Sequence, residues 1–112
     1  MRVLAFEDSY DIEALLVAGG VNLETMTLQQ RWNSSDALEH IQAFKPDILL
    51  LDHFMPPMKG LEVLKLLLAS STQRPRTIVA MSSEPSMNEA MLHAGADCGV
   101  IKFEVATLPI WN

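Results

Sequence analysis

The feature that most constrains the fold is an alternation of short apolar runs with longer segments of helical periodicity. The most apolar run is ILLL at residues 48–51, and others lie at 3–6, 77–81 and 100–101. A short run with no polar residue is typical of a strand that is buried on both faces. Strands that alternate with helices form a parallel sheet with helices packed on it. The chain is therefore predicted to be an α/β protein.

Weaker patterns predict one more strand and the first helix. Residues 24–29 alternate between polar and apolar side chains, which favours a half-exposed strand. Ile12, Leu15 and Leu16 recur at helical spacing. The glycine pair at 19–20 ends this helix, because glycine readily adopts the backbone conformation that follows a helix C-terminus.

Capping and breaking residues mark two of the other helices. Ser34 or Ser35 is expected to cap the second helix through its side chain. Pro46 ends that helix, since the residue before a proline avoids helical backbone angles. Pro85 suits the first turn of the fourth helix, and Gly95 closes it.

Composition and charge narrow the class of protein. The 112 residues suit a single domain, which we expect to span residues 1–112. Eight basic residues face fourteen acidic ones without a basic stripe, which argues against direct binding of nucleic acid. Cys98 is the only cysteine, so no internal disulfide is expected. Because no apolar run has the length of a membrane span or a signal peptide, we expect a cytoplasmic protein without membrane contact.

Charged and hydroxyl side chains follow the ends of four predicted strands. In chain order they are Glu7, Asp8, Asp52, Ser82 and Lys102. Open parallel sheets bind ligands beyond the carboxyl ends of their strands, where the strand order reverses. If the first and third strands are neighbours, three carboxylates meet in one crevice.

This combination of side chains indicates phosphoryl transfer. Three neighbouring carboxylates repel each other unless their pKa values rise or a cation lies among them. Hard oxygen ligands select a hydrated ion of the magnesium type, which lowers the negative charge that an incoming phosphate group meets. Ser82 and Lys102 can bind phosphoryl oxygens by hydrogen bond and charge. One carboxylate oxygen then acts as the nucleophile and forms an acyl phosphate.

Five motifs in this order resemble the receiver domains of two-component response regulators, among them the chemotaxis regulator. They are the acidic pair 7–8, PDILLLDHFMPPMKG at 46–60, MSSE at 81–84, HAGAD at 93–97 and Lys102, and the resemblance covers about residues 2–103. It implies a flavodoxin-like, doubly wound sheet of five parallel strands in the order 2-1-3-4-5.

The resemblance also implies a role for each residue at the strand ends. Asp52 is the implied phosphoacceptor, and Mg²⁺ is the implied cofactor. Asp52, Glu7 and Asp8 organise the ion, with Asp8 the more direct ligand, and Phe54 contributes its backbone carbonyl oxygen. Because that contribution comes from the backbone, the side chain at position 54 is free to vary.

The remaining implied roles concern the phosphoryl group and the partners. Ser82 and Lys102 contact the phosphoryl group. Its implied source is a phosphohistidine on a sensor histidine kinase or a phosphotransfer protein, and the output is binding to a downstream protein target. The chain is then not an enzyme, apart from catalysing its own phosphoryl uptake and loss.

Each of these residues also has an ordinary structural interpretation. Asp8 can cap the first helix, Asp52 can be a turn residue, Ser82 a strand-end hydroxyl and Lys102 a solvated lysine. The coincidence of all of them favours the site. Enzymes of two other kinds fit poorly: haloacid-dehalogenase-type phosphatases need a second acid where Phe54 stands, and cobalamin-binding domains need one residue between aspartate and histidine.

Three departures from the family keep a second hypothesis open, a pseudo-receiver that binds partners constitutively. Gly99 stands where the family usually has an aromatic residue that changes rotamer on activation. Phe103 follows Lys102 where the family has a cis proline, and a non-proline cis bond costs about 3 kcal/mol. We therefore expect a changed loop or a less well placed lysine.

The third departure is the tail, because only the ten residues 103–112 follow Lys102 and Pro109 interrupts them. The fifth helix is predicted to be shortened or missing. Two explanations stay open. In the first, the short tail leaves an apolar groove, which is covered either by Ile110 and Trp111 or by a second copy in a homodimer through the face of helix four and strand five. In the second, the chain continues further.

Overall fold

Five parallel strands form one sheet in a computed structural model that describes residues 1–111. The strand order is β2-β1-β3-β4-β5, which confirms the predicted order 2-1-3-4-5 and the flavodoxin-like α/β class. The strands are β1 (Arg2–Phe6), β2 (Thr27–Arg31), β3 (Ile48–Leu51), β4 (Thr77–Ala80) and β5 (Cys98–Gly99). Because all pairs are parallel, the carboxyl ends of the strands lie along one edge of the sheet.

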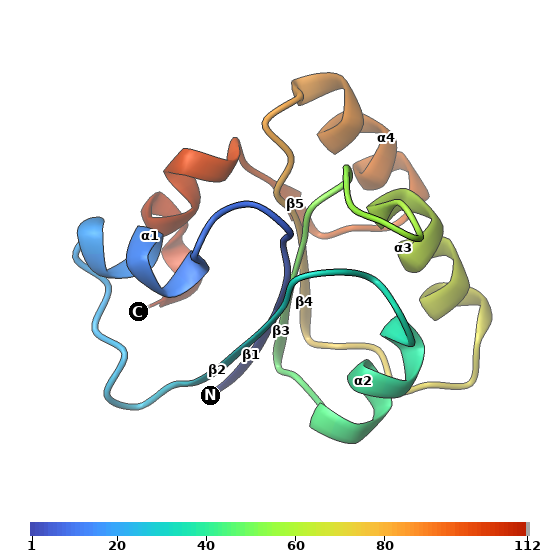
Figure 1. The fold of residues 1–112 in the computed structure, drawn as a ribbon, viewed down its shortest axis with the longest axis horizontal. Helices are drawn as coiled ribbons and strands as arrows, with labels where there is room; N and C mark the ends of the chain where they lie inside the picture. The colour runs from blue at the N-terminus through green and yellow to red at the C-terminus, as the bar shows by residue number, and fades with distance from the viewer. Residues whose placement is uncertain (112) are drawn as a thin grey trace.

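Helices cover both faces of the sheet (Figure 1). Helix α1 lies on one face together with the C-terminal segment, and α2, α3 and α4 lie on the other. The α-helices are α1 (Ile12–Ala18), α2 (Ala37–Phe44), α3 (Gly60–Ala69) and α4 (Pro85–Ala94). Pro85 begins α4, and Gly19 and Gly95 follow the ends of α1 and α4, as predicted.

The core consists of two hydrophobic clusters, one on each face. In β3, Leu49 and Leu51 point into the cluster beneath α2, α3 and α4, whereas Ile48 and Leu50 point into the cluster beneath α1. All four side chains are buried. A strand in the centre of a sheet that is covered on both sides needs apolar residues at every position, which explains the uninterrupted ILLL run.

Two short 3-10 helices follow β5. The sequence predicted a shortened or missing fifth helix in this segment. The two 3-10 helices are η1 (Lys102–Thr107) and η2 (Pro109–Trp111). Val105 is fully buried in the cluster beneath α1, and Ile110 and Trp111 pack against the same cluster. The Trp111 indole Nε1 donates a hydrogen bond to the Val105 carbonyl oxygen at 2.9 Å. The tail therefore covers the face that a longer helix would otherwise cover.

The predicted bounds of the second and fifth strands were wrong. The second strand begins at Thr27 rather than at residue 24, because Asn22 Oδ1 accepts a hydrogen bond from the Glu24 amide and holds the preceding residues in turns. The fifth strand comprises Cys98–Gly99 rather than residues 100–101. The apolar pair Val100–Ile101 forms the connection to η1 instead.

The predicted side-chain cap of the second helix was also wrong. Asp36 precedes α2, and no side chain makes a capping hydrogen bond there. Ser34 uses its hydroxyl to bind the loop after β3 instead: Oγ donates to the Met58 carbonyl oxygen at 2.6 Å and accepts from the Met58 amide at 2.7 Å. A tertiary contact therefore takes the hydroxyl that the sequence pattern assigned to a local cap.

None of the helices among residues 1–111 has the length and hydropathy that crossing a bilayer requires.

The contact between η1 and the end of α1 can be tested at Gly19. A Cβ atom on Gly19 would lie 2.2 Å from the Cβ of Ala106, although the backbone angles of Gly19 (φ −86°) suit any residue. We expect Gly19→Ala to lower the free energy of unfolding by about 1–3 kcal/mol through overpacking. Urea unfolding measures the effect.

The matched control is the double variant Gly19→Ala/Ala106→Gly, which restores the space. We expect it to be more stable than the sum of the two single changes predicts, as for residues in direct contact. Simple additivity of the two changes would contradict the packing of η1 on α1.

Candidate functional site

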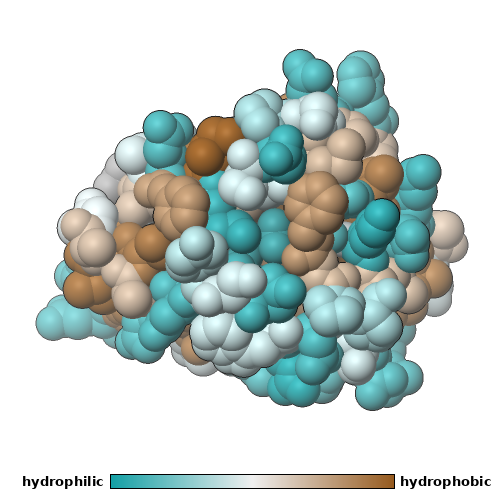
Figure 2. Space-filling model, turned by 45° about the horizontal axis from the view of Figure 1, so that its top comes forward, coloured by the Kyte–Doolittle hydropathy of each residue, from teal (hydrophilic) through white to brown (hydrophobic). Residues whose placement is uncertain are grey.

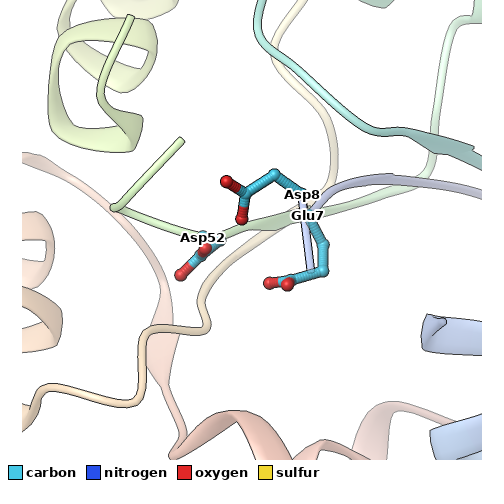
Figure 3. Close-up of side chains that lie close together, drawn as sticks. All are labelled: Glu7, Asp8 and Asp52. Carbon is cyan, nitrogen blue, oxygen red and sulfur yellow. The ribbon is translucent and has the colours of Figure 1, made fainter. Parts of the chain in front are cut away.

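The site lies where β1 and β3 end side by side. Phe6 pairs with Leu51 in the sheet, and the Asp52 amide donates a hydrogen bond to the Phe6 carbonyl oxygen at 3.0 Å. The residues that follow these strands are therefore neighbours. One carboxylate oxygen from each of Glu7, Asp8 and Asp52 lies within 4.8 Å of the others, and the three carboxylates gather between the two strand ends (Figure 3).

Glu7 forms the inner wall of the site and is completely buried. Its Oε2 accepts hydrogen bonds from the backbone amides of Ser9 at 2.9 Å and Tyr10 at 3.1 Å. Its Oε1 lies 2.9 Å from the ammonium nitrogen of Lys102. Both oxygens thus have strong electrostatic partners, which compensates for the loss of water around this carboxylate.

Lys102, the first residue of η1 after β5, reaches two of the three carboxylates. Its Nζ lies 2.9 Å from Glu7 Oε1 and 3.5 Å from Asp52 Oδ2, and the side chain is buried. Burial alone would lower the pKa of this lysine, but its ion pair with Glu7 and the charge of Asp52 raise the pKa above its ordinary value. Lys102 is therefore charged here.

The peptide bond between Lys102 and Phe103 is trans. The 3-10 helix η1 begins at Lys102 itself, and Pro56–Pro57 is the cis peptide among residues 1–111. The Phe103 ring packs edge-on against Tyr10 with centroids 4.9 Å apart. The Tyr10 ring in turn lies 5.4 Å from the Lys102 ammonium, so the loop still directs this lysine into the site.

Glu7 Oε1 and Asp52 Oδ1 are buried carboxylate oxygens without a hydrogen-bond partner among residues 1–111, and of these two only Glu7 Oε1 has an ion pair, with Lys102. The whole Asp52 side chain is buried. Burial and the nearby charge of Glu7 raise the pKa of Asp52 from 3.8 to about 6, while Lys102 opposes the shift. A buried oxygen without a partner, beside two further carboxylates, provides the hard donors that a Mg²⁺ ion prefers. The residues present fit such an ion.

Ser82 and Phe54 lie on the loops that border the carboxylates. Ser82 is buried two residues after the end of β4, and the amide of the intervening Met81 donates to the Leu51 carbonyl oxygen at 3.0 Å. The Ser82 hydroxyl accepts a hydrogen bond from the Glu84 amide at 3.1 Å. Phe54 follows Asp52 by two residues and its ring is 49% exposed. The structure thus brings both residues to the same edge of the sheet as the acidic cluster.

The surface over the strand ends has a hydrophilic centre bordered by hydrophobic side chains on both sides (Figure 2). Tyr10, Phe54 and Phe103 are the large exposed aromatic residues of the loops that follow β1, β3 and β5. Exposed aromatic side chains therefore accompany the charged groups at this edge of the sheet.

Three amide or hydroxyl side chains that sequence reasoning missed brace the loops of the site. Gln30 donates to the carbonyl oxygens of Glu7 and Tyr10, Ser34 binds the loop after Asp52, and Asn88 binds Ser82. No local pattern marks them, because their partners are backbone groups that lie outside their own helix or strand.

Comparison with known proteins agrees with this geometry. A family model described as "Response regulator receiver domain" matches residues 3–107. The chain belongs to the response regulator receiver family. Membership implies phosphorylation-based signalling, and receiver domains bind Mg²⁺ at an acidic pocket of the kind that Glu7, Asp8 and Asp52 form here.

Curated relatives and solved structures support the assignment. The receiver is 37% identical to protein-glutamate methylesterase/protein-glutamine glutaminase 5 of Myxococcus xanthus, over 86% of this chain and 28% of that protein. It is 30% identical to response regulator MprA of Mycobacterium ulcerans, over 87% of this chain and 41% of MprA. The chain thus spans well under half the length of these relatives.

Two structures of receiver domains show the same fold. The response regulator domain of Thermotoga maritima CheB superposes with a TM-score of 0.72 at 25% identity, over 91% of this chain and 78% of that one. The BeF3-activated receiver domain of Klebsiella pneumoniae RstA gives 0.73 at 26% identity, over 98% and 90% of the two chains.

The raised pKa of Asp52 predicts a pH dependence of stability in the absence of divalent ions. Between its ordinary pKa of 3.8 and about 6, the folded receiver binds more protons than the unfolded chain, so stability falls as the pH rises through this window. Asp52→Asn removes the buried charge. Above pH 6 we expect this variant to be more stable than the parent by on the order of 2 kcal/mol, and the difference to vanish below pH 3.8.

Urea unfolding in EDTA across this pH range measures the difference. Glu13→Gln, a change at an exposed carboxylate on α1, is the control and should stay within about 0.5 kcal/mol of the parent at each pH. An Asp52→Asn variant that is less stable than the parent above pH 6 would contradict the account of the site.

Proposed function

We propose that this receiver, as one domain of residues 1–112, accepts a phosphoryl group on Asp52 from a phosphohistidine of a sensor histidine kinase or phosphotransfer protein. The observation that carries the proposal is the buried Asp52 carboxylate, which has one unpartnered oxygen and lies between two acidic side chains and Lys102. This arrangement combines a nucleophile, a site for a cation and a positive charge at one strand edge.

We assign the metal site to Mg²⁺ held by Asp8, Asp52 and the backbone carbonyl of Phe54, with Glu7 as an organising carboxylate. The ion would neutralise charge at the site and attract phosphoryl oxygens. Glu7 is buried and bound by two amides and Lys102, so it supports the cluster from inside. Asp8 is partly exposed and therefore open to an ion that arrives from solvent.

The transfer follows from the positions of the charged groups. A carboxylate oxygen of Asp52 forms a bond to phosphorus, and the bond between phosphorus and the donor imidazole nitrogen breaks, with its electron pair returning to that nitrogen. Lys102 lies 3.5 Å from Asp52 and offers a positive charge to the phosphoryl oxygens, and Ser82 offers a hydroxyl donor. Positioning and charge neutralisation are the main contributions of the protein to such a reaction.

Output would come from binding a downstream protein, with a homodimer through α4 and β5 as one form of that interaction. Leu92 on α4 is 40% exposed, and Gly99 on β5 is also exposed. Exposed apolar side chains of this kind favour protein contacts. The domain then catalyses only the uptake and loss of its own phosphoryl group.

A pseudo-receiver remains the second candidate, and Gly99 and Phe103 favour it. Glycine has no side chain that can change rotamer, and Phe103 replaces the family's proline after the lysine. In this alternative the fold binds its partner without phosphorylation. The acidic cluster and the Lys102 ion pairs argue against this alternative, because burying these charges costs free energy and would serve no function in a domain that is never phosphorylated.

Reaction with a small phosphodonor separates the two candidates. We expect Mg²⁺ and acetyl phosphate to add one phosphoryl group to the Asp52 peptide, as measured by mass spectrometry, because the metal offsets the charge of the carboxylates. EDTA and Asp52→Asn should each abolish the addition, whereas the exposed Glu13→Gln control should keep it. If neither phosphate nor beryllofluoride binds the parent protein, the domain is a pseudo-receiver.

Phe54 predicts a slow loss of the phosphoryl group. Its exposed ring packs edge-on against His53, with centroids 4.8 Å apart, and cannot hydrogen-bond to an attacking water. We expect Phe54→Asn to shorten the half-life of the phosphoprotein severalfold, since an amide can orient water. Leu66→Asn, a similar change at an exposed position of α3, is the control. An unchanged decay rate in Phe54→Asn would refute the role of this ring.

A further inference from the structure

A buried amide on α4 connects the end of β4 to β5. Asn88 is 6% exposed. Its Oδ1 accepts a hydrogen bond from the Ser82 amide at 2.8 Å, and its Nδ2 donates to the carbonyl oxygens of Ser82 and Val100, both at 3.0 Å. Both donors and the acceptor of this side chain are thus used, as a buried amide requires.

The Asn88 side-chain amide replaces one backbone hydrogen bond of the parallel ladder between β4 and β5. The Val100 amide donates directly to the Ala80 carbonyl oxygen at 2.9 Å. In a regular parallel ladder the next bond would run from the Ser82 amide to the Val100 carbonyl oxygen. Here both of these groups bind the Asn88 side chain instead. The amide therefore extends the link between β4 and β5 beyond the point where the backbones pair.

Gly99 makes this insertion sterically feasible. A Cβ atom on Gly99 would lie 3.3 Å from the Asn88 Cβ and 3.5 Å from Leu92 Cδ1. The first distance is tighter than ordinary van der Waals contact, so a larger residue would push α4 away from β5. The glycine thus allows α4 to lie close enough for its asparagine to reach both strands.

We propose that Asn88 is a positioning residue for Ser82 and transmits changes at Ser82 to β5 and α4. The inference rests on the proposed function, in which the Ser82 hydroxyl binds a phosphoryl oxygen on Asp52. Ser82 is fully buried and both of its backbone polar groups bind the same amide. A shift of its main chain therefore moves the Asn88 amide, and with it α4 and the Val100 carbonyl.

NMR of the full chain with Mg²⁺ and beryllofluoride tests this role. In the parent protein we expect changes in amide chemical shift at Asp8 and His53, beside the acceptor, and also at Leu92 and Val100. In Asn88→Ala we expect the changes at Asp8 and His53 to persist and those at Leu92 and Val100 to be lost. A merely structural role would not separate the two sets of signals.

Two further variants keep the test decisive if Asn88→Ala does not fold. Asn88→Asp retains an acceptor for the Ser82 amide but loses both donors, so it should keep the response near Asp52 and lose the response at Val100. Gly99→Ala should weaken the Val100 response by moving α4. Glu89→Ala, at an exposed position of α4, is the control and should respond like the parent.

The outcomes separate the role of Asn88 from the proposed function. A Val100 response that remains as large in Asn88→Ala or Asn88→Asp as in the parent overturns the role of Asn88 and leaves the proposed function intact. A parent protein in which Asp8 and His53 do not respond overturns the proposed function and the role of Asn88 together.

Discussion

The parallel pairing of β1 with β3 is the constraint on which the rest of the site depends. It places residues that are about 45 positions apart in the sequence at adjacent strand ends, so that three carboxylates share one small space. Their mutual repulsion is costly in a buried environment, and Lys102 offsets part of it by lying 2.9 Å from Glu7 and 3.5 Å from Asp52. The negative charge that Lys102 does not offset at Asp52 favours the binding of a cation.

The C-terminal segment shows how a short tail can still support this site. Val105 and Trp111 pack beneath the sheet in two 3-10 helices, where a longer α-helix would otherwise lie. The same segment carries Phe103, whose ring packs on Tyr10 and thereby borders the Lys102 ammonium. Burial of the tail and orientation of the lysine are therefore linked, because both depend on where η1 begins.

Much of the fold could be predicted because it follows from local pattern. The ILLL run required a strand covered on both faces, and the order of apolar runs and helical segments required a parallel α/β sheet. The errors came where a distant partner decided the outcome. Ser34 was expected to cap a helix but binds Met58, and β5 ends at Gly99 because the groups beyond it bind the Asn88 side chain.

The sequence by itself marked the polar residues that follow the predicted strands, and so named Glu7, Asp8, Asp52, Ser82 and Lys102 as the candidate site. Only the tertiary structure decided how they are held. Gln30, Ser34 and Asn88 brace the loops through hydrogen bonds to backbone groups of other elements and loops. Such partners carry no periodic or motif signal, because a backbone amide or carbonyl is the same at every position until folding brings one particular group within reach.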